Sequence, residues 1–290
     1  MPQTPERPTK SASDTDNAVP PLSKRQRQDA QDRTSVSAVV VHEAIRLDGD
    51  EELKRPMSAL AWSGLAAGLS MGFSFVCEGL IRAYLPAAPW RPLATSLGYP
   101  LGFLIVVIGR QQLFTENTLT AIIPLLAHRN LPTLLSVLRL WAIVLAANLL
   151  GAHVFAWAAA DTTFLRNDIQ NALLELAKEG VAMTFGTALW RGVFAGWLIA
   201  MMVWMNAASD ASRIPIIITL TYVVGLAGLT HVIAGSVEFL YLVMAGVRSW
   251  WAYLDSYMLP TLIGNILGGV ALVSALNHAQ VVAGFNKRAK

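Results

Sequence analysis

Long apolar stretches separated by short polar connections make up most of the chain. From Met57 onward, six of them are each long enough to cross a bilayer, which takes about 20 apolar residues. They cover residues 57–85, 97–127, 134–160, 181–207, 214–246 and 258–283. The pattern predicts an all-α membrane protein whose transmembrane domain, residues 57–283, holds six helices, followed by a short tail over residues 284–290.

Residues 1–56 follow a different pattern. Roughly the first 40 residues are rich in Pro, Ser, Thr, Asp and Gln and hold too little apolar area to fold alone. Between Ser37 and Lys54, apolar residues return at helical spacing and predict a short amphipathic helix near residues 38–54, at the membrane surface or under the bundle. A solvated linker is the alternative. We therefore expect a disordered cytoplasmic head that carries one short helix.

Composition and charge separate this head from the body. Asp, Glu, Lys and Arg account for 19 of the first 56 residues but only 19 of residues 57–283, far below the roughly 25% of soluble domains. The net charge of +3 does not indicate a nucleic-acid partner, because the head itself carries 9 basic and 10 acidic residues. With the amino terminus inside, 15 basic residues lie on the cytoplasmic side and four outside, so both termini are expected to be cytoplasmic.

Several other classes of protein are not indicated. No secretory signal precedes the first apolar stretch, and the single cysteine, Cys77, excludes a disulfide framework and a cysteine-based metal site. The sequence has no P-loop, nucleophile elbow or carboxylate cluster. We expect no enzyme activity, no cofactor and no metal.

Corresponding motifs recur in the two halves of the body. The first and fourth apolar stretches carry GLAAG (64–68) and GVFAG (192–196), and the third and sixth carry ANLLGA (147–152) and GNILGG (264–269). Three helices per half is an odd number, so the halves must have opposite topology. This predicts a 3+3 inverted repeat, a recurrent design of transporters and channels.

The second stretch is interrupted by RQQLFTENT (110–118), in which seven of nine residues are polar or charged. A continuous helix would turn Arg110 and Glu116 toward different faces in hydrocarbon. Irregular backbone is tolerated there only where it is buried in protein or lines water, so we predict a loop between two half-helices whose free N–H groups attract an anion. The alternative is that the span ends near Gly109 and the polar run is an inside loop; the internal repeat favours the break.

The fifth stretch is interrupted by GLAGLTHVIAGS (225–236), which places His231 among small and apolar residues. Ionisable residues inside a membrane span are rare and usually face an aqueous path. Imidazole titrates between about pH 5 and 8, so His231 is predicted to exchange a proton with a passing weak acid. No further ligands lie at metal-binding spacing.

Small and polar residues in the other stretches suggest packing roles. The paired glycines are expected to let helix backbones approach closely. Asn148 and Asn265 are predicted to tie adjacent backbone across the repeat axis, with pore lining as the alternative. Four ionisable residues are expected to be paired between spans or at subunit contacts, without assignable partners: Glu78, Arg82, Arg191 and Glu238.

Three segments together resemble the formate/nitrite transporter family: LFTEN (113–117), GLTHVIAG (228–235) and LPTLIGNILGG (259–269). The resemblance covers roughly residues 57–283 and is closest to a bacterial inner-membrane branch with a long charged amino terminus. It implies an aquaporin-like fold of six spans, assembled as a homopentamer with one pore per protomer. Such pores pass small monovalent anions such as formate, nitrite, hydrosulfide or lactate.

The resemblance also implies roles for particular residues. Thr115 matches the threonine of the family's loop, His231 its central histidine, and three residues its apolar constrictions: Tyr99, Phe103 and Val224. The sequence departs from the family at Thr230, where Glu is usual, and at Gly235 and Gly196, where Asn is usual. The vestibule Lys of the family has no match in register, while Arg110 is an added cation near the loop.

The leading hypothesis is an inner-membrane channel or transporter for a small monovalent anion, coupled to a proton through His231. One alternative keeps the fold but makes the pore pass neutral solutes such as water, glycerol or undissociated acid. The other is a non-conducting membrane protein whose charged head recruits a cytoplasmic partner.

Overall fold

The computed structural model describes residues 23–26, 36–161, 165–181 and 183–288. The chain divides into two units, Met1–Val36 and Ser37–Lys290, which are described separately. In the first, residues 24–26 form one helical turn, and most of the predicted disordered head lies outside the described residues. The remaining paragraphs concern the second unit.

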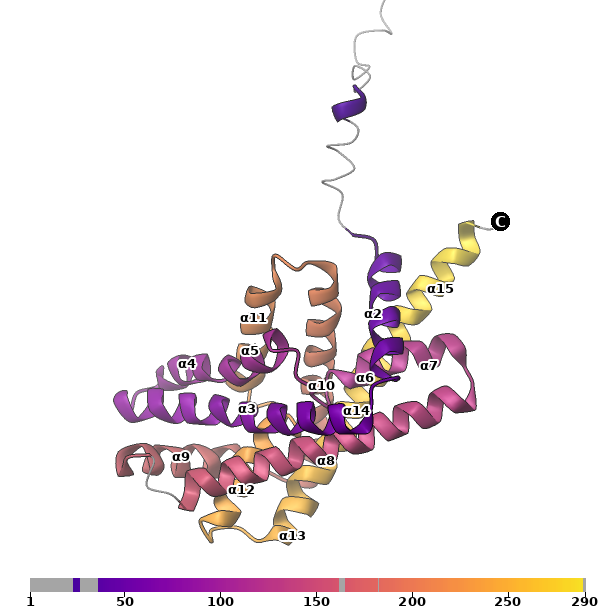
Figure 1. Cartoon of the computed structure of the whole chain (residues 1–290). Coiled ribbons are helices and arrows are strands. Elements are labelled where there is room, and N and C mark those ends of the chain that lie inside the picture. The colour runs from indigo at the N-terminus through magenta and orange to yellow at the C-terminus, as the bar shows by residue number, and fades with distance from the viewer. Residues whose placement is uncertain (1–22, 27–35, 162–164, 182, 289–290) are drawn as a thin grey trace, which may run out of the picture. The chain divides into compact units, whose positions relative to one another are not determined.

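The described part of the second unit is built of helices and contains no strand, which confirms the predicted all-α fold (Figure 1). Five helical segments in it are long and apolar enough to cross a membrane. Three are the single helices α3 (Met57–Tyr84), α8 (Leu131–Asp161) and α10 (Phe185–Ala208).

The last long segment is assembled from several pieces. It begins with α13 (Trp250–Ala252), passes through α14 (Leu259–Ile266) and ends with α15 (Leu276–Arg288). Two π-helical segments join these pieces, Tyr253–Met258 and Leu267–Ala275.

The second and fifth predicted stretches each consist of shorter helices. The second holds most of a 3-10 turn (Ser96–Gly98) and α5 (Pro100–Ile108), and then α6 (Asn117–Thr120) and α7 (Ile122–His128). Helix α4 (Arg91–Thr95) precedes this predicted stretch, and with α5 it belongs to the remaining long segment, Arg91–Ile108. The fifth holds α11 (Arg213–Leu226) and α12 (Ala234–Met244). Helix α5 ends where the polar run begins, and α11 ends just before the segment that contains His231.

A longer helix was also not predicted from the hydropathy pattern. Helix α9 (Asn167–Gly180) lies where we expected only a connection, and α10 consequently begins at Phe185 rather than at residue 181. Its sequence alternates charged residues with apolar ones at helical spacing, so its mean hydropathy is low. Ile169 and Leu173 bury its apolar face in a cluster that also contains Phe75 of α3.

Two close helix crossings use the paired glycines. Helices α3 and α8 run side by side (Figure 1), and α10 packs against α14. A Cβ added at Gly68 would lie 2.1 Å from the Asn148 carbonyl oxygen, and one at Gly196 would lie 2.3 Å from that of Asn265. Small residues are therefore required at both crossings, where lipid supplies no hydrophobic drive for association.

Helix α2 (Ala38–Glu52) packs against the bundle. Val41 and Ile45 are buried in a cluster with Leu119 of α6 and Ile123 of α7. The preceding unit is thus followed directly by a helix that is anchored on the transmembrane domain.

Replacing Gly68 by Ala should destabilise the α3–α8 crossing, because the new methyl group would overlap the Asn148 carbonyl. Overpacking of this kind typically costs about 1–3 kcal/mol. The matched control is Gly186→Ala in the first turn of α10, where an added Cβ meets no atom within 4 Å. Thermal unfolding in detergent should show a lower melting temperature for Gly68→Ala only; equal melting temperatures would contradict the close crossing.

The contact of α2 with α15 should weaken on acidification. His42 Nε2 lies 3.0 Å from His278 Nδ1, and burial, followed by the charge of His278, lowers the pKa of His42 from its ordinary value of 6.5. Neutral His42 therefore contributes fully to the free energy of unfolding when the pH is above its ordinary pKa of 6.5. This contribution is lost as the pH falls toward the lower pKa that His42 has in the folded state.

Hydrogen exchange of α2, corrected for the intrinsic pH dependence of exchange, should be faster at about pH 5 than at about pH 7.5. A His42→Gln variant should lose much of this difference, whereas His153→Gln serves as the control, because His153 packs against Trp250 and not against α2. An unchanged pH dependence in His42→Gln would show that other groups are responsible.

Candidate functional site

Thr115 and His231 meet in the middle of the bundle. Thr115 lies in the non-helical segment 109–116 between α5 and α6, and His231 in the segment 227–233 between α11 and α12. Thr115 Oγ1 is 2.7 Å from His231 Nε2, and both residues are almost fully buried. Two residues from non-helical segments that are far apart in the sequence thus form one hydrogen-bonded pair.

The hydrogen bonds of the ring define its protonation. The backbone N–H of Ala234 donates to His231 Nδ1 at 3.1 Å, so Nδ1 is an acceptor without a proton. In neutral imidazole the proton is then on Nε2, which donates to Thr115 Oγ1. The hydroxyl hydrogen of Thr115 is left available for another acceptor.

Asn148 on α8 holds the first of the two non-helical segments. Its Nδ2 donates to the carbonyl oxygens of Gly64 at 2.7 Å and Gln112 at 2.8 Å, and its Oδ1 accepts the N–H of Phe114 at 2.9 Å. An unpaired backbone group in hydrocarbon costs several kcal/mol, so this amide satisfies groups that the interrupted helix leaves free.

Asn265 on α14 does the same for the second segment. Its Nδ2 donates to the carbonyl oxygens of Gly192 and Thr230, both at 2.9 Å, and its Oδ1 accepts the N–H of Val232 at 2.9 Å. The two asparagines make the same three kinds of bond, to the glycine of a neighbouring helix and to two groups of the non-helical segment. The correspondence of the two halves therefore extends to individual atoms.

Aromatic and apolar side chains enclose the threonine–histidine pair. The Phe103 ring packs edge-on against the imidazole with 5.0 Å between centroids, and Tyr99 lies 5.5 Å from Phe103. Phe103 and Val224 are fully buried, and Tyr99 is 5% exposed. The pair thus lies in surroundings from which bulk water is excluded.

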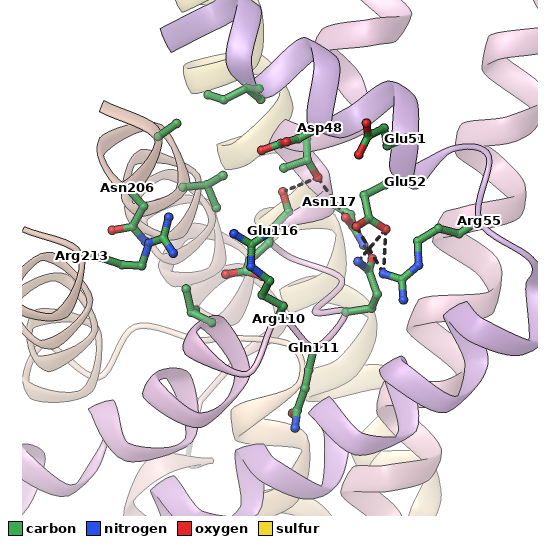
Figure 2. Close-up of a pocket in the computed structure, with 16 residues that line it drawn as sticks. Asp48, Glu51, Glu52, Arg55, Arg110, Gln111, Glu116, Asn117, Asn206 and Arg213 are labelled. Carbon is green, nitrogen blue, oxygen red and sulfur yellow. Dashed lines mark hydrogen bonds and ion pairs between the residues drawn. The ribbon is translucent and has the colours of Figure 1, made fainter. Parts of the chain in front are cut away.

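A cavity of about 450 Å³, here called cavity A, lies beside the first segment. Figure 2 shows Asp48, Glu51 and Glu52 of α2 on one side of it and Arg110 and Glu116 on the other.

Polar bonds connect α2 to the first segment across this cavity. Gln112 Nε2 donates to Glu52 Oε2 at 2.8 Å, and Asn117 Nδ2 donates to Gln112 Oε1 at 3.0 Å. Arg110 is exposed and has a positive φ of 50°. It lines cavity A with Arg213 and does not line cavity B with His231. Glu116 lines the same cavity as Arg110, whereas His231 does not.

A second cavity of about 240 Å³, here called cavity B, is lined by the second segment. Thr230, His231, Tyr99 and Gly235 contribute to its wall. The first segment thus lines cavity A and the second lines cavity B, and the contact of Thr115 with His231 joins the two segments.

In the part of the chain that the structure describes, no group of three His, Cys, Asp or Glu residues is placed to hold a metal ion.

The sequence model of the formate/nitrite transporters matches residues 39–279. The chain belongs to the formate/nitrite transporter family. It is 40% identical over 251 residues to the inner membrane protein YfdC of Escherichia coli K12, covering 87% of this chain and 81% of that protein. It is 25% identical over 236 residues to the formate channel BtFdhC of Bacillus thuringiensis, covering 78% and 88%.

Two solved structures share the fold. A pentameric formate channel with formate bound has a TM-score of 0.65 at 19% identity and covers 78% of this chain and 98% of its own. An FNT family ion channel has a TM-score of 0.65 at 17% identity and covers 82% and 94%. The chain is therefore a multi-pass membrane protein with the fold of formate/nitrite channels.

The structure explains two of the departures from the family pattern. A Cβ at Gly235 would lie 1.5 Å from the Tyr257 hydroxyl oxygen, which donates to the His231 carbonyl oxygen at 3.2 Å. A Cβ at Gly196 would meet the Asn265 carbonyl oxygen. Neither position has room for an asparagine in this packing. Thr230 donates its hydroxyl to the Ala188 carbonyl oxygen at 2.8 Å.

Residues that sequence reasoning missed line both cavities. Gln112 lies within RQQLFTENT and could have been chosen for its place in that polar run. Tyr257 carries no such signal, because only the packing shows that its hydroxyl fills the space beside Gly235. Arg82 is bound by Glu175 and Glu179 of α9, the helix that the hydropathy pattern did not reveal.

Removing either asparagine amide should destabilise the protein strongly. Asn148→Ala or Asn265→Ala leaves buried backbone groups without partners, at about 1–3 kcal/mol for each group. The control is Asn171→Ala on an exposed position of α9. A melting temperature of Asn148→Ala equal to that of the control would contradict the assigned role.

Proposed function

We propose that the chain is a channel for a small monovalent anion of a weak acid, such as formate or nitrite, accompanied by a proton. The observation that carries this proposal is the buried contact between Thr115 and His231, enclosed by Phe103, Tyr99 and Val224 with a cavity lined by each adjoining segment. The names of the relatives support the class of substrate, since one is a formate channel and a neighbouring structure holds formate.

The site residues have distinct roles in this proposal. The Thr115 hydroxyl and the His231 Nε2–H are the neutral donors that an anion meets between the cavities. Arg110 and Arg213 supply positive charge in cavity A, while Phe103, Tyr99 and Val224 form the constriction.

Proton coupling follows from the free-energy cost of moving an ion through the constriction. An isolated ion in a low-dielectric, water-poor passage loses far more solvation energy than a neutral molecule does. An anion that acquires a proton where it meets His231 avoids that cost. The neutral imidazole suits this step, because it holds the acid by a hydrogen bond without trapping the anion as an ion pair.

We further propose a homopentamer in the inner membrane with both termini in the cytoplasm, as the charge distribution predicts. Cavity A and α2 then face the cytoplasm and cavity B faces the opposite side. The pentameric neighbour structure and the inner-membrane relative support this arrangement.

Transport by reconstituted protein tests the proposed function. Thr115→Val and His231→Ala should each reduce formate uptake into proteoliposomes by about tenfold or more, since a hydrogen bond to a charged group contributes about 1.5–3 kcal/mol. His153→Ala is the control, because His153 lines neither cavity and stacks against Trp250.

Parent rates in both variants would overturn the site assignment. Vesicle swelling in glycerol without any formate flux would favour the neutral-solute pore. Lack of both fluxes, with the head still needed for a cellular phenotype, would favour a non-conducting membrane protein.

A further inference from the structure

Two carboxylates inside the bundle face cavity B. Glu78 on α3 is 6% exposed, and Glu238 on α12 is partly buried. Within the described residues, neither carboxylate has a hydrogen bond or an ion pair within 4.0 Å. Both belong to segments that we assign to the membrane domain, where unpaired ionisable groups are rare and usually functional.

The charged and titratable groups around them do not neutralise the pair. Arg82 is already bound by Glu179 at 2.6 Å and by Glu175 at 3.4 Å. Arg191 is exposed and makes no ion pair with any carboxylate in the described part of the chain. The groups that share the cavity wall with the pair are Arg82, Arg191, Glu179, Tyr99, Tyr257 and His231.

Two like charges in one poorly solvated site cannot both ionise easily, and such a pair tends to share a proton. The arrangement of Glu78 and Glu238 therefore favours one bound proton at neutral pH.

Two residues of the same cavity wall carry polar atoms without a protein partner. Thr95 lines cavity B and is 3% exposed, and its Oγ1 has no hydrogen-bond partner among the described residues. The Nε of Arg82, on the same wall, is likewise buried without a partner there. A hydroxyl and a guanidinium N–H are donors that suit a small anion.

His231 cannot readily supply a proton to such an anion. Its Nδ1 accepts the Ala234 N–H and its Nε2–H is directed at Thr115, so the ring is neutral and has no second proton to give. The pair and His231 line the same cavity, which allows an anion held there to contact both in turn.

We propose that Glu78 and Glu238 form a shared proton-binding site in cavity B that protonates a weak-acid anion before it passes Phe103 and His231. This rests on the proposed function. The carboxylic O–H bond of the pair breaks and an O–H bond to the anion forms, which gives a neutral acid and a doubly ionised pair. The pair regains its proton from water on the side to which cavity B opens. Passage in the other direction reverses these steps.

The test uses full-length protein with Glu78→Gln, Glu238→Gln and the double substitution. Gln preserves the size of each side chain but cannot exchange a proton. The matched control is Glu43→Gln, because Glu43 is exposed on α2 and lines neither cavity. Radiolabelled formate uptake into proteoliposomes is measured at about pH 5 and about pH 7.5, together with internal acidification reported by a trapped dye. The infrared C=O band of protonated carboxylic acid is recorded on the same proteins at about pH 7.5.

We expect formate uptake by the double variant to fall by about tenfold or more at about pH 7.5. The fall should be much smaller at about pH 5, where the bulk solution supplies more neutral acid. It should also lose an infrared band that the parent and Glu43→Gln retain. Parent-like uptake and acidification in the double variant would overturn the proposal, as would loss of uptake by the same factor at both pH values.

If the proposed function is wrong, the experiment gives a different set of results. If the parent moves no formate at either pH, the anion-channel assignment fails, and the infrared band alone decides whether the pair binds a proton. Absence of that band in the parent would overturn the proton site.

Discussion

The structure depends on hydrogen bonds to the backbone groups that are left free where two helices end inside the bundle. In hydrocarbon these groups have no water to bind, so an interrupted helix is stable only with internal partners. Asn148 and Asn265 provide them, each binding two carbonyl oxygens and one N–H. Close approach at Gly68 and Gly196 brings the helices that carry these asparagines near enough. The packing glycines and the site thus belong to one arrangement.

This arrangement also determines the chemistry at the centre. Because both non-helical segments are fixed, Thr115 and His231 meet at 2.7 Å in an apolar enclosure, with the ring in one neutral tautomer. Charged residues line the two cavities on either side, and α2 contributes acidic residues to cavity A. In the function proposed above, a passage with polar ends and a neutral, apolar middle favours species that can lose their charge on the way through.

Much of this could be predicted from the sequence because the signals are local. The apolar stretches, the polar run RQQLFTENT and a lone His231 in a span are visible without any contacts, and so are the paired Asn and Gly motifs. Helix α9 could not be predicted from hydropathy, because its charged face lowers the mean and its apolar face is defined only by burial against α3. The partners of Arg82 were missed for that reason. The filling of the Gly235 space by Tyr257 and the common cavity of Glu78 and Glu238 depend on packing between distant segments, which a single sequence does not reveal.

The central claim is that an anion crosses the protein at the contact between Thr115 and His231. A cryo-electron microscopy map of the protein in lipid nanodiscs with saturating formate tests it most directly. The account predicts formate density inside the protomer, within hydrogen-bond distance of Thr115 Oγ1 or His231 Nε2, that is lost in the Thr115→Val variant. Formate density only outside this passage, unchanged by that substitution, would contradict it.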